Sequence, residues 1–248
     1  MFIGEPLLYW AAGALAVLAA TAIEAQRMRL DPWTMYLAGI AGLGGALLGG
    51  ELYVFLAAPG PLADGAERGA IGAFAGAAAF GALVLRLRGG EFLRYADAAV
   101  PGVALGYAVY RIGCFVNGCC FGIPTDLPWG VIFGPGTEVF ASQVAQGLIS
   151  PEAARTLSVH PTQLYHAALG LAAFFILRRR SGSRLALALA LYGSGRFVIE
   201  FLRAETQPVL GPLDVNHIAC LAMLMVALLL WRFAGRGSAR LLFLKSTV

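Results

Sequence analysis

Two arginines lie within apolar stretches that predict membrane-spanning helices. Counted from Asp97 and from Arg184, Arg111 and Arg196 both climb about 18–21 Å along their helices, at about 1.5 Å per residue. A charged side chain inside a bilayer costs at least about 2.5–3.5 kcal/mol, so it calls for a functional explanation. The planar guanidinium fork matches phosphate oxygens. The pair therefore predicts a site for a dianionic or phosphate-bearing ligand, with phospholipid as the natural candidate.

Other polar residues are expected at the same depth. Glu200 follows Arg196 by one helical turn, and Arg203 comes one turn later, so the three share one helix face. A purely structural Arg196–Glu200 ion pair is an alternative, but it would leave Arg111 without an obvious partner. Glu51 falls near the outer end of an earlier predicted helix.

Histidine is scarce, and one of the three begins the run His160-Pro-Thr-Gln-Leu-Tyr165. Proline suits the first turn of a helix. His160 is therefore either a helix-capping residue or a general base, and Tyr165 lies within about a turn and a half. His166 and His217 have no polar cluster around them in the sequence, and we interpret them as packing residues.

Three of the four cysteines surround the end of one predicted helix, at Cys114, Cys119 and Cys120, and Cys220 falls near the outer end of the last helix. In an oxidising compartment a disulfide from Cys119 or Cys120 to Cys220 is permitted. No CxxC pair occurs, so we expect no metal site.

The elements that position these residues follow from composition. The chain is 59% hydrophobic and 13% charged, whereas soluble domains carry about 25% charged residues. A membrane-spanning helix needs about 20 apolar residues. We therefore predict an all-α fold, a polytopic bundle of seven transmembrane helices in a single domain, 1–248, with one long outward-facing loop at 121–160. The predicted spans are 6–23, 33–56, 69–87, 97–119, 161–177, 185–202 and 215–233.

The basic residues predict the orientation of the bundle. They concentrate in alternate connections and in the C-terminal tail, which places those segments in the cytoplasm and the N-terminus outside. The net charge is +4, with no basic stripe of the kind that binds nucleic acid. Glycines at small-xxx-small spacing, such as Gly45 and Gly49 or Gly72 and Gly76, predict close packing between helices.

Several segments resemble a known family. They are Arg111-Ile-Gly-Cys-Phe-Val-Asn-Gly-Cys-Cys-Phe-Gly122, Pro124-Thr-Asp-Leu-Pro-Trp-Gly-Val131, the His160–Tyr165 run and Gly195-Arg-Phe-Val-Ile-Glu-Phe-Leu-Arg203. In this order they resemble the signature of the prolipoprotein diacylglyceryl transferase family, from about Asp97 to the C-terminus.

The resemblance implies a seven-helix enzyme of the bacterial inner membrane whose site opens outward. Such an enzyme moves a diacylglyceryl group from phosphatidylglycerol to the lipobox cysteine of a prolipoprotein, in contact with membrane lipids and without a metal or redox cofactor. It implies that Arg111 and Arg196 hold the lipid phosphate and that Glu200 orients Arg196. It also implies that Asn117, Gly118 and Gly122 shape the signature loop, with Arg203 at the outer mouth. Cys114 and Tyr165 are further candidate substrate-binding residues.

The sequence departs from the family pattern at four places. Cys114 replaces an asparagine, Cys119 replaces the glutamate of Asn-Gly-Glu, Glu67-Arg68-Gly69 occupies the region of a His-Gly-Gly block, and Glu51 replaces an arginine. The general base is then His160 or a carboxylate such as Glu51, or the protein is a paralogue with another acceptor. A transporter or non-catalytic lipid-binding protein is a third hypothesis, but a transporter should show repeated halves, and none are visible.

Overall fold

A computed structural model describes residues 5–57, 67–204 and 208–245, and within these ranges the chain is helical with only isolated β-bridges. The predicted all-α fold is confirmed, and each predicted span coincides with a helix. An additional short helix, α5, lies in the predicted loop. The helices are α1 (Glu5–Arg27), α2 (Pro32–Ala57), α3 (Glu67–Leu87), α4 (Phe92–Asn117), α5 (Glu138–Ala145), α6 (Thr162–Arg179), α7 (Arg184–Glu200) and α8 (Val215–Lys245).

Three of these helices are long and apolar enough to cross a membrane: Pro32–Tyr53 in α2, Phe92–Asn117 and Val215–Arg232 in α8. Large apolar side chains face outward, as at Leu47, which is 73% exposed, whereas Glu200 is 1% exposed. Apolar outside and polar inside is the arrangement that lipid favours and water does not. The chain is therefore a polytopic membrane protein, although length and hydropathy identify only three of the seven predicted spans.

The chain divides into two compact units, Ala22–Ala99 and the combination of Met1–Thr21 with Val100–Val248. The expectation of a single domain stays a prediction. In the first unit Asp31 immediately precedes α2, and its carboxylate accepts hydrogen bonds from the Thr34 hydroxyl and amide at 2.5 and 2.9 Å. These bonds, the hydroxyl first, lower the pKa of Asp31 below its ordinary value.

Helices α2 and α3 pack through glycines at the predicted spacing. Cβ atoms added to Gly45 or Gly49 would collide with the backbone of Gly76 or Gly72, and the reverse also holds. The two helix backbones therefore lie in direct contact, as small-xxx-small sequences allow in lipid.

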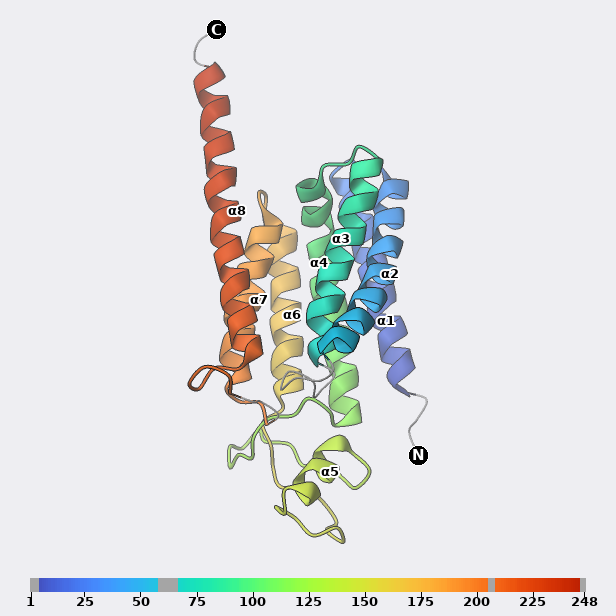
Figure 1. Ribbon diagram of the computed structural model, residues 1–248, viewed down its shortest axis with the longest axis vertical. Coiled ribbons are helices and arrows are strands. Elements are labelled where there is room, and N and C mark those ends of the chain that lie inside the picture. Colours follow the sequence, from blue (N-terminus) through green and yellow to red (C-terminus); the bar gives the residue numbers. More distant parts are fainter. Residues whose placement is uncertain (1–4, 58–66, 205–207, 246–248) are drawn as a thin grey trace. The chain divides into compact units, whose positions relative to one another are not determined.

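The second unit holds the arginines of interest. Its helices α6 and α7 pack together, as do α7 and α8 (Figure 1). Helix α6 packs closely on α4, because a Cβ at Gly170 would lie 2.9 Å from the carbonyl oxygen of Ala104. Helix α6 therefore packs on both α4 and α7, the helices that carry Arg111 and Arg196.

The long connection between α4 and α6 is ordered and includes α5 (Figure 1). Isolated bridges join Val159 to Pro124 and Val131, and Gly122 to Arg203. Phe121, Val139 and Val159 form a small core of their own. The loop is therefore a fixed structure attached to the ends of α6 and α7.

Gly122 is the point where the loop passes between these two elements. A Cβ there would lie 2.6 Å from the carbonyl oxygen of Leu202 and 2.6 Å from the Cβ of His160. Its amide also donates to the His160 carbonyl at 3.0 Å. Only glycine fits this crossing without displacing backbone.

Gly122→Ala is expected to destabilise the protein by about 1–3 kcal/mol, because the added methyl group meets backbone on two sides. Thermal unfolding in detergent measures the change. Gly134→Ala is the matched control, because nothing lies within 4 Å of a Cβ at Gly134 in the same loop. Equal unfolding midpoints for the two variants would show that the crossing at Gly122 is looser than described.

Candidate functional site

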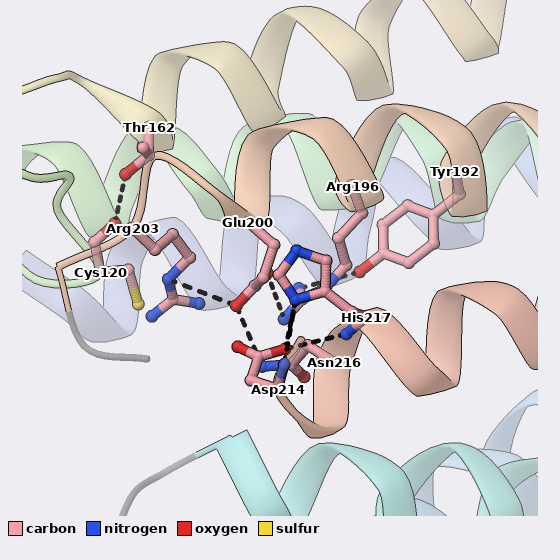
Figure 2. A network of polar contacts seen from close by, with 9 residues as sticks. All are labelled: Cys120, Thr162, Tyr192, Arg196, Glu200, Arg203, Asp214, Asn216 and His217. Atoms are coloured by element: carbon pink, nitrogen blue, oxygen red, sulfur yellow. Dashed lines mark hydrogen bonds and ion pairs between the residues drawn. The ribbon is translucent and has the colours of Figure 1, made fainter. Parts of the chain in front are cut away.

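Arg196 and Glu200 occupy one buried face of α7. An Nη atom of Arg196 lies 3.4 Å from a Glu200 oxygen, and the other Nη donates to the Tyr192 hydroxyl at 3.2 Å. Figure 2 shows the three side chains along one side of the helix, successive members one turn apart. The i, i+4 spacing produces this line of contacts, so Arg196 is held from both directions along its helix.

The Glu200 carboxylate is the centre of a wider polar network (Figure 2). It accepts a hydrogen bond from the Asn216 amide at 3.0 Å, and the Nε of Arg203 lies 3.9 Å from the same oxygen. Arg203 follows the end of α7 at Glu200, rather than continuing the helix, and it is bridged to Gly122 of the loop. One buried carboxylate thus connects two arginines, α8 and the loop.

Asp214 and His217 complete the polar layer at the start of α8. An Asp214 oxygen accepts from the His217 amide at 2.9 Å, which is a helix N-cap. The His217 ring nitrogen lies 2.8 Å from that oxygen, and the ring packs on Phe201 at 4.3 Å between centroids. His217 was interpreted as a packing residue, and it packs, but it also contacts this carboxylate.

Arg111 is buried on α4 in different surroundings. It is 7% exposed, and its guanidinium lies over the rings of Tyr107 and Tyr110 at 5.0 and 5.7 Å. Among the described residues no carboxylate forms an ion pair with it, and its Nε has no hydrogen-bond partner. Aromatic faces attract a cation without neutralising it, so Arg111 keeps its charge available.

A pair of tyrosines joins the two arginines. Tyr107 and Tyr192 meet edge to face, with ring centroids 5.3 Å apart, and each lies four residues before its arginine. Arg111 also acts electrostatically on the Glu200 carboxylate that holds Arg196. The predicted convergence of the two cations is therefore present in the structure.

His166 lies beside this pair. It is fully buried on α6, its ring is 6.0 Å from that of Tyr107, and neither ring nitrogen has a hydrogen-bond partner. Both arginines act on it electrostatically. The interpretation of His166 as a packing residue missed this position against the charged site.

His160 and Tyr165 form a second polar group at the start of α6. The His160 Nδ1 lies 3.2 Å from the Tyr165 hydroxyl, which also accepts from the indole of Trp129 at 2.9 Å. The backbone of His160 pairs with Gly122 and Ile123. The described contacts of His160 are thus with the loop and α6, and its role as a base stays a prediction.

The end of α4 carries the remaining predicted residues. Asn117 closes the helix, and Gly118 follows with φ +66°, where a Cβ would lie 2.8 Å from that of Thr137. Cys114 lies one turn after Arg111 and is buried. Hydrogen bonding with its thiol, together with burial, raises the pKa of Cys119 and of Cys120 above the ordinary thiol value.

The hypothesis of a disulfide to Cys220 is wrong for this structure. All four cysteines are free, and the sulfurs of Cys119 and Cys120 lie beside that of Cys114. The spacing of these residues around a helix end brings them together and leaves Cys220 on α8.

Four polar residues of this region were not predicted from the sequence: Tyr107, Tyr192, Asp214 and Asn216. The tyrosines could have been found from their i−4 position to each buried arginine, and Asp214 from the Asp-x-x-His pattern at a helix start. Glu51 lies on α2 in the other compact unit, and its role stays a prediction. The segment 58–66, which connects α2 to α3, lies outside the described residues.

The arrangement suits binding of an anion with several oxygens. Arg196 and Arg203 both lie near the Glu200 carboxylate, and Arg111 acts electrostatically on the same carboxylate. Guanidinium groups fixed in a low-dielectric site stabilise negative charge without reorganising at the moment of reaction.

This chain resembles proteins of one known family over most of its length. Residues 7–233 match the family described as prolipoprotein diacylglyceryl transferase. A phosphatidylglycerol–prolipoprotein diacylglyceryl transferase of Clostridium tetani is 30% identical, over 89% of this chain and 90% of that protein. Proteins of the same name from Corynebacterium diphtheriae and Gloeobacter violaceus are 29% and 35% identical, over 77% and 68% of this chain and 74% and 61% of those proteins.

The buried arginine pair and the ordered loop thus occur in a sequence that matches one family over nearly its whole length. The chain belongs to the prolipoprotein diacylglyceryl transferase family.

Proposed function

We propose that this protein transfers the diacylglyceryl group of phosphatidylglycerol to the thiol of a prolipoprotein lipobox cysteine. The single observation that carries the proposal is the buried pair Arg111 and Arg196, joined by Tyr107 and Tyr192. The relatives that carry this activity in their names support the identity of the two substrates.

In the proposed reaction the acceptor thiol loses its proton and its sulfur attacks the glyceryl carbon that carries the phosphate ester. A carbon–sulfur bond forms, the carbon–oxygen bond to phosphate breaks, and glycerol phosphate leaves with the bonding electrons. Negative charge grows on the departing phosphate, where Arg111 and Arg196 stabilise it. The thiol proton goes to a general base, for which His160 is the candidate in the same compact unit as the two arginines, whereas Glu51 stays a candidate from the sequence alone.

Within this proposal Glu200 is a positioning residue. Its carboxylate lies 3.4 Å from Arg196 and 3.9 Å from Arg203, and Asn216 fixes it from α8. It orients the two guanidinium groups before the lipid arrives, and it competes with the lipid phosphate for their charge. Both effects follow from its short distances to both cations.

The loop residues form the wall of the proposed site. Asn117, Gly118 and Gly122 set the course of the chain at the end of α4, Cys114 lies beneath them, and Tyr165 stands at the start of α6. Arg203 is placed at the outer mouth. Support comes from the contacts of Gly122 with His160 and Leu202.

We further propose that seven of the eight helices, all except α5, span the bacterial inner membrane. The N-terminus lies outside, the C-terminus in the cytoplasm, and the loop with α5 faces outward. The alternating basic connections support this orientation. Phosphatidylglycerol then enters from the surrounding lipid and the prolipoprotein from the outer side.

A paralogous transferase with another acceptor is the second candidate. The presence of Cys119, where the family signature has a glutamate, is the observation that favours it. Incubation with phosphatidylglycerol and a lipobox peptide separates the two, because release of glycerol phosphate without peptide modification supports the second candidate.

Arg111→Ala and Arg196→Ala are each expected to lower turnover at least about 10²-fold, because each removes charge stabilisation of the departing phosphate. Mass spectrometry of the lipobox peptide, with the enzyme in phosphatidylglycerol nanodiscs, measures the product. Arg178→Ala is the matched control, because Arg178 lies at the end of α6 over Phe174. Normal turnover in either of the first two variants would exclude the phosphate clamp.

Glu200→Gln is expected to lower both kcat and KM for phosphatidylglycerol, by about tenfold for kcat, because the arginines lose orientation but also a competing anion. Loss of folded protein would reduce the apparent kcat alone, so the KM distinguishes positioning from a structural role. Glu200→Asp keeps the charge and should leave KM near that of the unaltered protein. A raised KM in Glu200→Gln would contradict the positioning role.

A further inference from the structure

Three cysteine thiols meet at the end of α4, in a group that the proposed transfer reaction does not use. The sulfur atoms of Cys114, Cys119 and Cys120 all lie within 4.8 Å of one another. Cys114 is buried and the other two are half-buried. From the sequence we expected no metal site, because these three residues do not form a CxxC pair.

The geometry of the helix end explains why they meet. Gly118 has φ +66°, its amide donates to the Phe115 carbonyl at 3.1 Å, and the Cys119 amide donates to the Cys114 carbonyl at 3.1 Å. This pair of bonds is a Schellman motif, which places the second residue after the helix against the last turn. The motif therefore brings the side chain of Cys119 to that of Cys114.

The third thiol is added by the next residue. Cys120 has φ +57°, a left-handed conformation that is unfavourable for a residue other than glycine. The carbonyl of Cys120 accepts from the Thr162 hydroxyl at 2.7 Å, and that of Cys119 accepts from the Gln163 amide at 2.7 Å. Thr162 and Gln163 are fully buried at the start of α6, so the cysteine backbone is fixed on both sides.

We propose that Cys114, Cys119 and Cys120 form a binding site for a thiophilic d¹⁰ metal cation, of the zinc(II) or copper(I) class. Thiolate sulfurs are the preferred ligands of these ions. A tetrahedral ion with bonds of about 2.3 Å holds its sulfurs about 3.8 Å apart, so side-chain rotations that shorten the sulfur–sulfur distances by up to about 1 Å close the group. The three thiol protons pass to solvent as the ion binds.

The local charge favours such an ion. Three thiolates around zinc(II) carry a net charge of −1, and Arg111 interacts electrostatically with both Cys114 and Cys120. No described carboxylate pairs with Arg111, so the metal–thiolate group would have a cation beside it. A disulfide would use two of the three sulfurs and leave the third unexplained.

A tetrahedral zinc(II) ion would leave one coordination position open, because the described residues of this group supply three ligands. Water or a substrate atom can occupy that position. The site lies one helical turn from Arg111, so its occupancy also fixes the α4 end on which the proposed phosphate clamp depends.

The test measures metal binding by purified full-length protein in detergent, reduced and then freed of reductant, against a chromophoric chelator. Zinc(II) and copper(I) are titrated separately. We expect one ion per chain for at least one of them, and at least a hundredfold weaker binding by Cys114→Ser, Cys119→Ser and Cys120→Ser. Cys220→Ser is the matched control, a buried cysteine on α8 outside the group, and it should bind as the unaltered protein does.

Cobalt(II) gives a second measurement that needs no activity. Its thiolate charge-transfer absorption should weaken in each of the three variants and persist in Cys220→Ser, and the ion should raise the unfolding temperature of the unaltered protein but not that of Cys119→Ser. Equal binding in all four serine variants would overturn the proposal, as would binding of neither ion or recovery of the reduced-and-reoxidised protein with only two free thiols. Because no lipid or acceptor is present, these outcomes are independent of the proposed transfer reaction.

Discussion

A guanidinium group kept charged inside a bundle of apolar helices is the constraint on which this structure depends. Arg196 is stabilised by the Glu200 carboxylate at 3.4 Å and by the Tyr192 hydroxyl at 3.2 Å. Arg111 is stabilised by the faces of Tyr107 and Tyr110. The two solutions differ in consequence, because a carboxylate cancels most of the charge and an aromatic face cancels little. Arg111 therefore keeps more of its charge available than Arg196 does.

The long connection between α4 and α6 is also fixed by specific contacts. Gly118 ends α4 in the left-handed conformation, and Gly122 passes between His160 and Leu202 with no room for a side chain. Between these two glycines lie Cys119 and Cys120, whose carbonyls are fixed by α6. Five consecutive residues thus determine where the helix stops, where the loop crosses and where two thiols lie, so the family signature in this region has a structural basis.

The sequence predicted the helices well and the contacts unevenly. Helix positions follow from local apolar content, so every predicted span coincides with a helix, whereas α5 is too short for that signal. The contact of Arg196 with Glu200 followed from helical spacing, whereas the prediction that Arg203 shares their helix face is wrong, because α7 ends at Glu200. The meeting of Tyr107 with Tyr192, and of Asn216 with Glu200, depends on how α4, α7 and α8 pack, which one sequence does not encode locally. The cysteine group was missed because a helix-end turn, rather than a metal-binding spacing, brings it together.

Each tyrosine lies four residues before its arginine, so the contacts of both pairs depend on the rotational register of their helices. Each residue turns an α-helix by about 100°, so one residue inserted between Tyr107 and Arg111, or between Tyr192 and Arg196, would aim tyrosine and arginine at different neighbours. Evolution can therefore lengthen the exposed turn around Gly147 far more freely than either of these five-residue segments. Insertions and deletions among relatives should accordingly avoid both segments, even where the surrounding apolar residues exchange freely.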